Sequence, residues 1–275
     1  MNEIRINEKI TLSNDLPFVL FGGPCVIEGR ERTFFLAESI KEIASKLKIP
    51  FVFKASFDKA NRSSIDSFRG QGMQEGLRIL ADVKEKFDLP IITDVHDVSQ
   101  VKEVAKVVDV IQIPAFLCRQ TDLLIEAGKS GAVINVKKGQ FMAPWDMENV
   151  VKKIHSTNNE KVALTERGAS FGYNNLVVDM RSLEIMKNFA PVIFDATHSV
   201  QIPGGKGTSS DGNREFVRPL ARAAASIGVA GIFMEIHDEP EKALSDGPNM
   251  VPLSELEKLL SELVEFDKLA KGYNK

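Results

Sequence analysis

Short apolar runs alternate with longer amphipathic stretches along the chain from residue 18 onward. The short runs are typical of strands buried on both faces of a parallel sheet, and the longer stretches place apolar side chains at helical spacing. The expected strands are residues 18–21, 51–54, 91–94, 110–113, 133–137, 162–165, 192–195 and 232–235. The expected helices are residues 32–47, 74–86, 98–107, 122–128, 146–154, 181–188, 214–227 and 254–270. Eight consecutive pairs predict an α/β fold, a closed TIM (β/α)8 barrel.

One domain, residues 1–275, is the simplest organisation, because no linker rich in Pro, Gly or Ser divides the chain. Residues 1–13 precede the first expected strand and alternate loosely between apolar and polar side chains. This pattern predicts a short N-terminal extension, a β-hairpin that closes the floor of the barrel.

Charge and cysteine content narrow the classes of partner. The 35 basic and 38 acidic residues are mixed along the chain and give a net charge of -3, so we expect no binding to nucleic acid or to an anionic membrane surface. The apolar runs fall short of the roughly 20 residues of a membrane span, and the first residues lack a signal-peptide core, so we expect a cytoplasmic protein. Cys25 and Cys118 are expected to be free thiols, with Cys118 an apolar filler.

Nearly every expected strand ends at a residue able to take part in chemistry. Enzymes with this fold build their active sites at the C-terminal ends of the barrel strands. The residues at or just beyond these ends are Cys25, Glu28, Lys54, Asp94, His96, Gln112, Lys137, Glu166, Arg167, Asp195, His198, Glu235 and His237. Each alone is compatible with a solvated loop residue, but the whole set at one end of one barrel predicts an active site.

Several cationic residues lie at these strand ends or in the loops that follow. They are Lys54, Lys59, Arg62, Arg119, Lys137 and Arg167. Arginine binds carboxylate or phosphate in bidentate fashion and lysine supplies a mobile point charge, so the mixed set indicates a substrate with several oxyanions, such as a phosphorylated metabolite. Lys138 points to the opposite face of its strand from Lys137, and we expect it to form an ordinary surface ion pair.

A second set combines one thiol, one imidazole and two carboxylates, namely Cys25, His198, Glu235 and Asp246. In a closed barrel the first and last strands are neighbours, so these groups are able to converge on one divalent ion. Mixed S, N and O donors suit Zn²⁺, Fe²⁺, Co²⁺ or Mn²⁺ better than Mg²⁺. The alternative is a catalytic histidine with hydrogen-bonded carboxylates and an incidental thiol. Residues 203–212, rich in small and flexible residues, are expected to form either a lid over the site or a loop without function.

Seven segments carry a resemblance to the 3-deoxy-D-manno-octulosonate 8-phosphate synthases, and they span nearly the whole chain. The segments are Gly23-Pro-Cys-Val-Ile-Glu, Phe53-Lys-Ala-Ser-Phe-Asp-Lys-Ala-Asn-Arg-Ser-Ser, Ile113-Pro-Ala-Phe-Leu-Cys-Arg-Gln-Thr-Asp, Asn135-Val-Lys-Lys-Gly-Gln-Phe, Leu164-Thr-Glu-Arg-Gly, Phe171-Gly-Tyr-Asn-Asn-Leu and Phe194-Asp-Ala-Thr-His-Ser-Val-Gln. The related heptulosonate-phosphate synthases typically have Lys-Pro-Arg-Thr where this chain has Lys59-Ala-Asn-Arg62, which favours the octulosonate branch.

The resemblance implies an aldol-type condensation of phosphoenolpyruvate with D-arabinose 5-phosphate and water, which releases phosphate and feeds lipopolysaccharide synthesis. It also implies a homotetramer. The residues implied to bind phosphoenolpyruvate are Lys54, Lys59, Gln112, Lys137 and Arg167. Those implied to bind the aldose phosphate are Asn61, Arg62, Ser63 and, from a neighbouring subunit, Arg119, and Phe116 is a further expected substrate-binding residue. The residues placed for proton transfer or orientation of the reactants are His198, Asp94 and Lys137.

The same resemblance bears on the metal. Family members with Cys at the Cys25 position need a divalent ion, and members with Asn there do not. Ser245-Asp-Gly-Pro-Asn, however, is similar to the run found in metal-free members, which leaves open whether the ion is strictly required.

Three other functions stay open from the sequence. The first is a heptulosonate-phosphate synthase that uses erythrose 4-phosphate. The second is a Schiff-base aldolase with Lys137 as the nucleophile, because neighbouring cations are able to lower the pKa of a lysine. The third is a non-catalytic barrel that binds phosphosugars, because this fold serves many functions.

Overall fold

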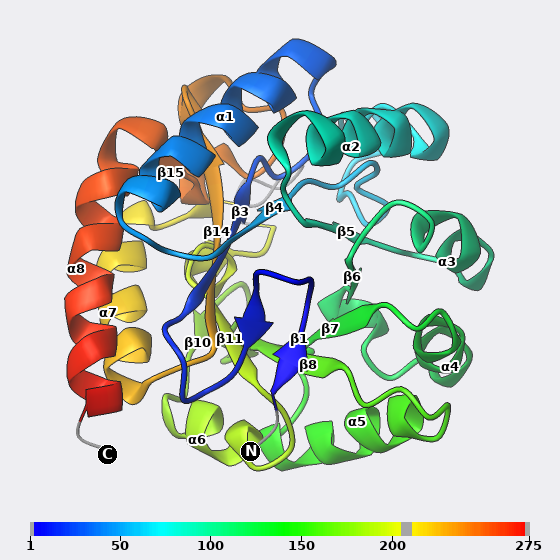
Figure 1. Cartoon of the computed structure of the whole chain (residues 1–275), viewed down its shortest axis with the longest axis vertical. Coiled ribbons are helices and arrows are strands. Elements are labelled where there is room, and N and C mark those ends of the chain that lie inside the picture. Colours follow the sequence, from blue (N-terminus) through cyan, green and yellow to red (C-terminus); the bar gives the residue numbers. More distant parts are fainter. Residues whose placement is uncertain (1–2, 205–210, 273–275) are drawn as a thin grey trace.

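Eight parallel strands close into a barrel in the described part of this computed structural model, which comprises residues 3–204 and 211–272 (Figure 1). The strands are β3 (Val19–Gly23), β4 (Phe51–Lys54), β5 (Ile91–Asp94), β6 (Val110–Ile113), β7 (Val133–Lys137), β8 (Val162–Glu166), β11 (Val192–Asp195) and β14 (Gly231–His237). Each pairs in parallel with the next, and β14 pairs with both β11 and β3. The predicted barrel is confirmed, with five strands at the expected bounds.

The helices form a ring around the barrel (Figure 1). They are α1 (Arg30–Lys46), α2 (Met73–Phe87), α3 (Val98–Val104), α4 (Thr121–Lys129), α5 (Met147–His155), α6 (Arg181–Lys187), α7 (Val217–Ile227) and α8 (Leu253–Gly272). The helix expected at 98–107 ends at Val104. The N–H of Val107 donates to the Val104 carbonyl three residues earlier, which is the pattern of a 3-10 turn and not of an α-helix. The helix expected at 214–227 starts as a 3-10 turn, Arg214–Phe216, before α7. Among the described residues, no helix is both long and apolar enough to cross a membrane.

A short hairpin closes the N-terminal end of the barrel, as predicted for residues 1–13. β1 (Ile4–Arg5) pairs antiparallel with β2 (Thr11–Leu12), and the hairpin lies in front of the barrel in Figure 1. Ile4 and Leu12 are buried in one apolar cluster with Phe21 and other side chains of the barrel interior. The floor of the barrel is therefore dry.

The alternation of side chains along each strand decides where the polar groups lie. Side chains of β4, β5, β6, β11 and β14 that belong to the interior cluster are Val52, Ile92, Val110, Ile193 and Phe233. Because alternate residues of a strand share a face, the next inward-facing residues are Lys54, Asp94, Gln112, Asp195 and Glu235. Polar side chains thus form the layer directly above the apolar floor.

The smaller strands lie outside the barrel wall. β9 (Ala169–Ser170) pairs with β10 (Leu176–Val177), β12 (Gln201–Ile202) pairs with β13 (Asp211–Gly212), and β15 (Val251–Pro252) adds to the end of β14. Residues 205–210, the centre of the expected lid, lie outside the described residues, so the lid stays a prediction.

The end of β3 passes very close to the end of β4, at Gly23. A Cβ atom at this position would overlap the Lys54 carbonyl oxygen, and Gly23 has φ +153°. The close approach brings the carbonyl of Cys25 within 3.0 Å of the Lys54 ammonium. Only glycine permits this junction, which places the two strand ends of the site side by side.

We expect Gly23→Ala to lower the free energy of unfolding by about 3 kcal/mol, because the new methyl group forces the backbones of β3 and β4 apart. Equilibrium urea denaturation at 25 °C measures the change. Gly29→Ala is the matched control, since an added Cβ there meets no atom within 4 Å among the described residues. Equal losses for the two variants would contradict the steric explanation.

Candidate active site

A cavity of about 440 Å³ opens at the C-terminal ends of the strands. Its lining includes most of the residues predicted for the site, which are Lys54, Lys59, Asn61, Arg62, Ser63, Asp94, Gln112, Phe116, Lys137, Arg167, His198 and Asp246. Cys25 and Glu235 are buried next to it and contact its lining. The structure thus brings together side chains that lie far apart in the sequence.

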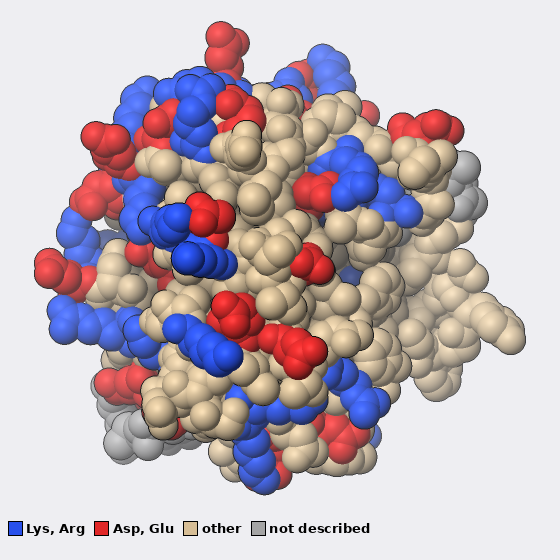
Figure 2. Space-filling model, turned by 90° about the vertical axis from the view of Figure 1, so that its right-hand side faces the viewer, with Lys and Arg blue, Asp and Glu red and all other residues tan. Residues whose placement is uncertain are grey.

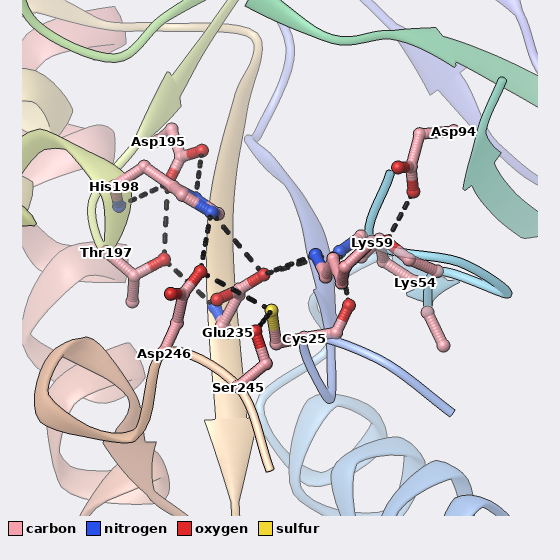
Figure 3. A network of polar contacts seen from close by, with 12 residues as sticks. Cys25, Lys54, Lys59, Asp94, Asp195, Thr197, His198, Glu235, Ser245 and Asp246 are labelled. Carbon is pink, nitrogen blue, oxygen red and sulfur yellow. Dashed lines mark hydrogen bonds and ion pairs between the residues drawn. The ribbon is translucent and has the colours of Figure 1, made fainter. Parts of the chain in front are cut away.

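Glu235 is the buried anion on which the lysines converge (Figure 3). The Lys54 ammonium lies 3.3 Å from Glu235 Oε1, and the Lys59 ammonium lies 3.7 Å from the same oxygen. Burial alone would raise the pKa of Glu235, but the positive charges of His198, Lys59 and Lys54 outweigh it and lower the pKa to about 2. Glu235 is therefore ionised.

Cys25, Glu235 and Asp246 form a group that fits a metal ion. One ligand atom from each lies within 4.8 Å of the others. His198 Nε2 is 3.5 Å from Glu235 Oε1 and 3.7 Å from Asp246 Oδ2, so the imidazole lies beside this group of three. Among the described residues, Glu235 Oε2 is buried without a hydrogen-bond partner. A buried carboxylate oxygen with a free lone pair beside a thiol is a fitting ligand for a divalent ion.

The surroundings of Cys25 disfavour its thiolate form, even with the ammonium groups of Lys59 and Lys54 nearby. Burial and the charge of Glu235 raise the pKa of Cys25 well above its usual value. Cys25 Sγ lies 3.1 Å from Ser245 Oγ and 3.5 Å from Asp246 Oδ2. Both Cys25 and Cys118 are buried free cysteines, as expected.

Asp195 orients two of the predicted residues. Its carboxylate accepts hydrogen bonds from the Lys137 ammonium at 2.5 Å and from His198 Nδ1 at 2.8 Å. Burial opposes its ionisation, but His198 and Lys137 lower the pKa of Asp195 well below its usual value. Because Nδ1 of His198 is bound, Nε2 faces Glu235 and Asp246 (Figure 3). Asp195 had no assigned role in the sequence analysis, although its position at a strand end signalled it.

A second dyad faces the cavity from β5. His96 Nε2 lies 2.8 Å from Asp94 Oδ2, and Ser56 Oγ donates to the other oxygen of Asp94. Burial raises the pKa of Asp94, but the hydrogen bond and charge of His96 lower it far below its usual range. In the described part of the chain, His96 Nδ1 has no partner. His96 also had no assigned role, although it follows Asp94 by two residues.

Arg167 is placed to bind an anion. Its side chain is only 4% exposed, and one guanidinium nitrogen donates to Gln201 Oε1 at 3.0 Å. The other terminal nitrogen is buried and has no acceptor among the described residues. Burial lowers the pKa of Arg167. An unsatisfied buried guanidinium beside Lys54 and Lys137 indicates that the cavity receives a carboxylate or phosphate.

Two predicted residues lie at or beyond the rim. Phe116 lines the cavity but is 54% exposed. Arg119 is exposed and does not line the described cavity, so in this chain it does not join the other predicted residues.

The prediction of a surface ion pair for Lys138 is wrong. Lys138 is 2% exposed and lies 3.5 Å from the buried carboxylate of Glu166. The side chain does point away from the barrel interior, but the space outside β7 is the packed layer beneath the helices. Glu166 also accepts hydrogen bonds from the backbone of Arg167 at 3.0 Å and from Ser182 Oγ at 2.5 Å. This pair therefore supports the loop that carries Arg167.

Comparison with known proteins agrees with this geometry. Residues 2–272 match the DAHP synthetase I family. A protein named 2-dehydro-3-deoxyphosphooctonate aldolase from Geobacter metallireducens is 60% identical over 270 residues, which cover 98% of this chain and 99% of that protein. Proteins with the same name from Dichelobacter nodosus and Rickettsia prowazekii are 62% and 57% identical, and the matches cover 94% and 98% of this chain and 94% and 98% of those proteins.

We expect Glu166→Gln to lower the free energy of unfolding by about 3 kcal/mol, because it leaves the Lys138 ammonium buried without a counter-charge. Adding Lys138→Met should recover part of the loss. Urea denaturation measures both. Glu103→Gln, which breaks an exposed pair with Lys106, should change stability little. A double variant no more stable than Glu166→Gln alone would contradict the role of the pair.

Proposed function

The chain belongs to the DAHP synthetase I family, and on this premise we propose that it is a 3-deoxy-D-manno-octulosonate 8-phosphate synthase. The reaction joins phosphoenolpyruvate, D-arabinose 5-phosphate and water to give 3-deoxy-D-manno-octulosonate 8-phosphate and inorganic phosphate, a step toward lipopolysaccharide. The observation that carries the proposal is the cation-lined cavity beside the Cys25, Glu235 and Asp246 cluster, in which one nitrogen of Arg167 has no partner among the described residues. The near full-length similarity to proteins named for this activity supports it.

Phosphoenolpyruvate binds among the cations that rise from the barrel strands. We assign its carboxylate and phosphate to Lys54, Lys137 and Arg167, with Gln112 and Lys59 completing the set. One terminal nitrogen of Arg167 is buried and has no partner among the described residues, so it is able to donate to the anion. Two anionic substrates repel each other, and fixed positive charges in the cavity offset that repulsion while they align the reactants.

Arabinose 5-phosphate lies toward the rim, where Asn61, Arg62 and Ser63 bind its phosphate end. Its aldehyde then faces the floor, near Asp94 and His198, where C3 of phosphoenolpyruvate forms the new carbon bond. Water adds to C2, and the phosphate of phosphoenolpyruvate leaves. The Asp94–His96 dyad is placed to move protons to and from the reacting oxygens, while His198 Nε2 faces Glu235 and Asp246.

The proposed cofactor is a divalent ion of the Zn²⁺, Fe²⁺, Mn²⁺ or Co²⁺ type, held by Cys25, His198, Glu235 and Asp246. When bound, such an ion supplies Lewis acidity that orients and polarises an oxygen of the aldose or of water. The free oxygen of Glu235 and the mixed donor set fit this cofactor.

Lys137 serves as an electrostatic group in this proposal. Burial lowers the pKa of Lys137, which a Schiff-base aldolase would require, but the Asp195 carboxylate at 2.5 Å opposes that shift. The pair favours a charged ammonium over a free amine nucleophile. The Lys59-Ala-Asn-Arg62 run favours arabinose 5-phosphate over erythrose 4-phosphate.

We also propose a homotetramer in the cytoplasm. Figure 2 shows a broad area, at the lower right of that view, with few charged side chains. Exposed aromatic side chains on the loops after β6, β7 and β8 include Phe116, Phe141, Trp145, Phe171 and Tyr173. Loops with such side chains are typical of subunit interfaces. Two unpaired cysteines suit a reducing compartment.

The first test measures phosphate release from phosphoenolpyruvate. We expect release that depends on arabinose 5-phosphate, is abolished by EDTA and returns with Mn²⁺, Zn²⁺ or Fe²⁺, because the ion completes the site. Erythrose 4-phosphate is the control for the heptulosonate alternative and should support much slower release. A rate indifferent to EDTA would keep the reaction but reject the metal. Substrate binding without any release would favour the non-catalytic barrel.

The second test asks whether Arg119 acts across a subunit boundary. Arg119→Ala and Lys137→Met should each be nearly inactive alone, because each removes a charge that binds substrate. When the two variants are co-expressed in equal amounts, about one quarter of the sites combine an intact Lys137 with an Arg119 from a neighbour. We expect the steady-state activity of the mixed assembly to be about one quarter of that of the unsubstituted protein. No gain in the purified mixed assembly would show that Arg119 does not act on a neighbouring site.

A further inference from the structure

Asp246 lies in a loop, whereas Glu235 and Cys25, the other two residues of the cluster, lie in or directly after barrel strands. Glu235 lies within strand β14, and Cys25 follows strand β3 directly. Asp246 instead lies in a loop between two 3-10 turns, Pro240–Lys242 and Gly247–Asn249, and has a left-handed backbone with φ 52°. Aspartate tolerates this conformation better than most residues, but its own backbone preference does not select it over the commoner regions. The position of its carboxylate therefore depends on contacts that fix the loop.

Those contacts meet at Leu244, two residues before Asp246. The backbone N–H of Leu244 donates to Glu28 Oε1 at 2.8 Å, and its carbonyl accepts from Arg62 Nη2 at 2.9 Å. Ser245, which lies between Leu244 and Asp246 in the sequence, places its hydroxyl 3.1 Å from Cys25 Sγ. A charged side chain thus holds each backbone group of Leu244, at the point where the loop turns toward the cluster.

Glu28 is itself held firmly on its other side. Glu28 Oε2 lies 3.1 Å from Arg32 Nη1 and 3.4 Å from His237 Nε2, and its side chain is 9% exposed. Fully buried His237 accepts at Nδ1 from the backbone N–H of Glu239, 3.0 Å away. Because Nδ1 is an acceptor, the proton lies on Nε2 and points to Glu28. The carboxylate therefore receives donors on both oxygens and has little freedom to move.

We propose that Glu28 is a positioning residue that holds the Leu244–Asp246 segment so that Asp246 completes the metal site. The inference rests on the metal site of the proposed function. Glu28 touches neither the ion nor a substrate in this scheme and acts through the backbone of Leu244. Carboxylates that fix a ligand from outside a metal site commonly contribute 10-fold to 100-fold in affinity.

The experiment compares metal affinity in full-length Glu28 variants, by competition of Zn²⁺ with a chelating dye. Glu28→Ala should weaken affinity about 10-fold. Glu28→Gln should fall between this variant and the unsubstituted protein, because an amide has one acceptor oxygen and is unable to serve both Leu244 and the Arg32 and His237 pair. Far-UV circular dichroism checks folding, and the glutamine variant carries the test if alanine impairs it.

A double-mutant cycle separates positioning from a general structural effect. In a protein that carries Asp246→Ala, adding Glu28→Ala should cause no further loss of Zn²⁺ affinity, because the ligand that Glu28 positions is absent. Glu31→Ala, on an exposed residue of α1, is the matched control and should leave affinity unchanged.

The measurements distinguish an error in the proposed metal site from an error in the proposed role of Glu28. If the unsubstituted protein binds no Zn²⁺, the proposed metal site is wrong and this inference falls with it. If it binds Zn²⁺ and Glu28→Ala does not weaken affinity, or weakens it equally without Asp246, then only the positioning role is wrong.

Discussion

The alternation of side chains along the barrel strands is the constraint on which the rest of the structure depends. An inward-facing apolar residue, such as Phe233 or Ile193, is followed two positions later by an inward-facing charge, Glu235 or Asp195. The hairpin of residues 4–12 seals the space below. The charged layer therefore lies directly above apolar side chains. Its charged groups pair either with one another or with a ligand in the cavity above.

This arrangement buries several charged side chains, and their pairing determines which ligands the cavity is able to bind. Removing the ammonium groups of Lys54 and Lys137 from water is costly, and Glu235 and Asp195 offset part of that cost. Within the described residues, these pairs leave Arg167 with a buried N–H and Glu235 with a buried carboxylate oxygen that have no hydrogen-bond partner. The unsatisfied groups of opposite sign indicate two ligands: an anion for Arg167 and a cation for Glu235.

The sequence predicted the barrel well because apolar runs such as residues 51–54 and 133–137 are buried on both faces. It also indicated most residues of the cavity, since strand ends meet at one rim. It was unable to show which neighbours pair, because contacts such as Asp195 with His198 and Glu28 with Leu244 depend on side-chain geometry and loop paths. The prediction for Lys138 was wrong because alternation shows only that its side chain points away from the barrel interior. Alternation does not show that the helices cover this side chain.

The two halves of the site differ in rigidity, and the difference suits the chemistry. Lys54, Lys137 and Glu235 lie on strands whose backbones are fixed by neighbours on both sides, whereas Asn61, Arg62 and Asp246 lie on loops. Charge that develops during carbon–carbon bond formation is stabilised best by groups that need no reorganisation, which strands provide. Loops suit the recognition of a long, flexible sugar phosphate. Because Arg62 donates to the Leu244 carbonyl, the loop proposed to bind the sugar also contacts the loop that carries the proposed metal ligand Asp246.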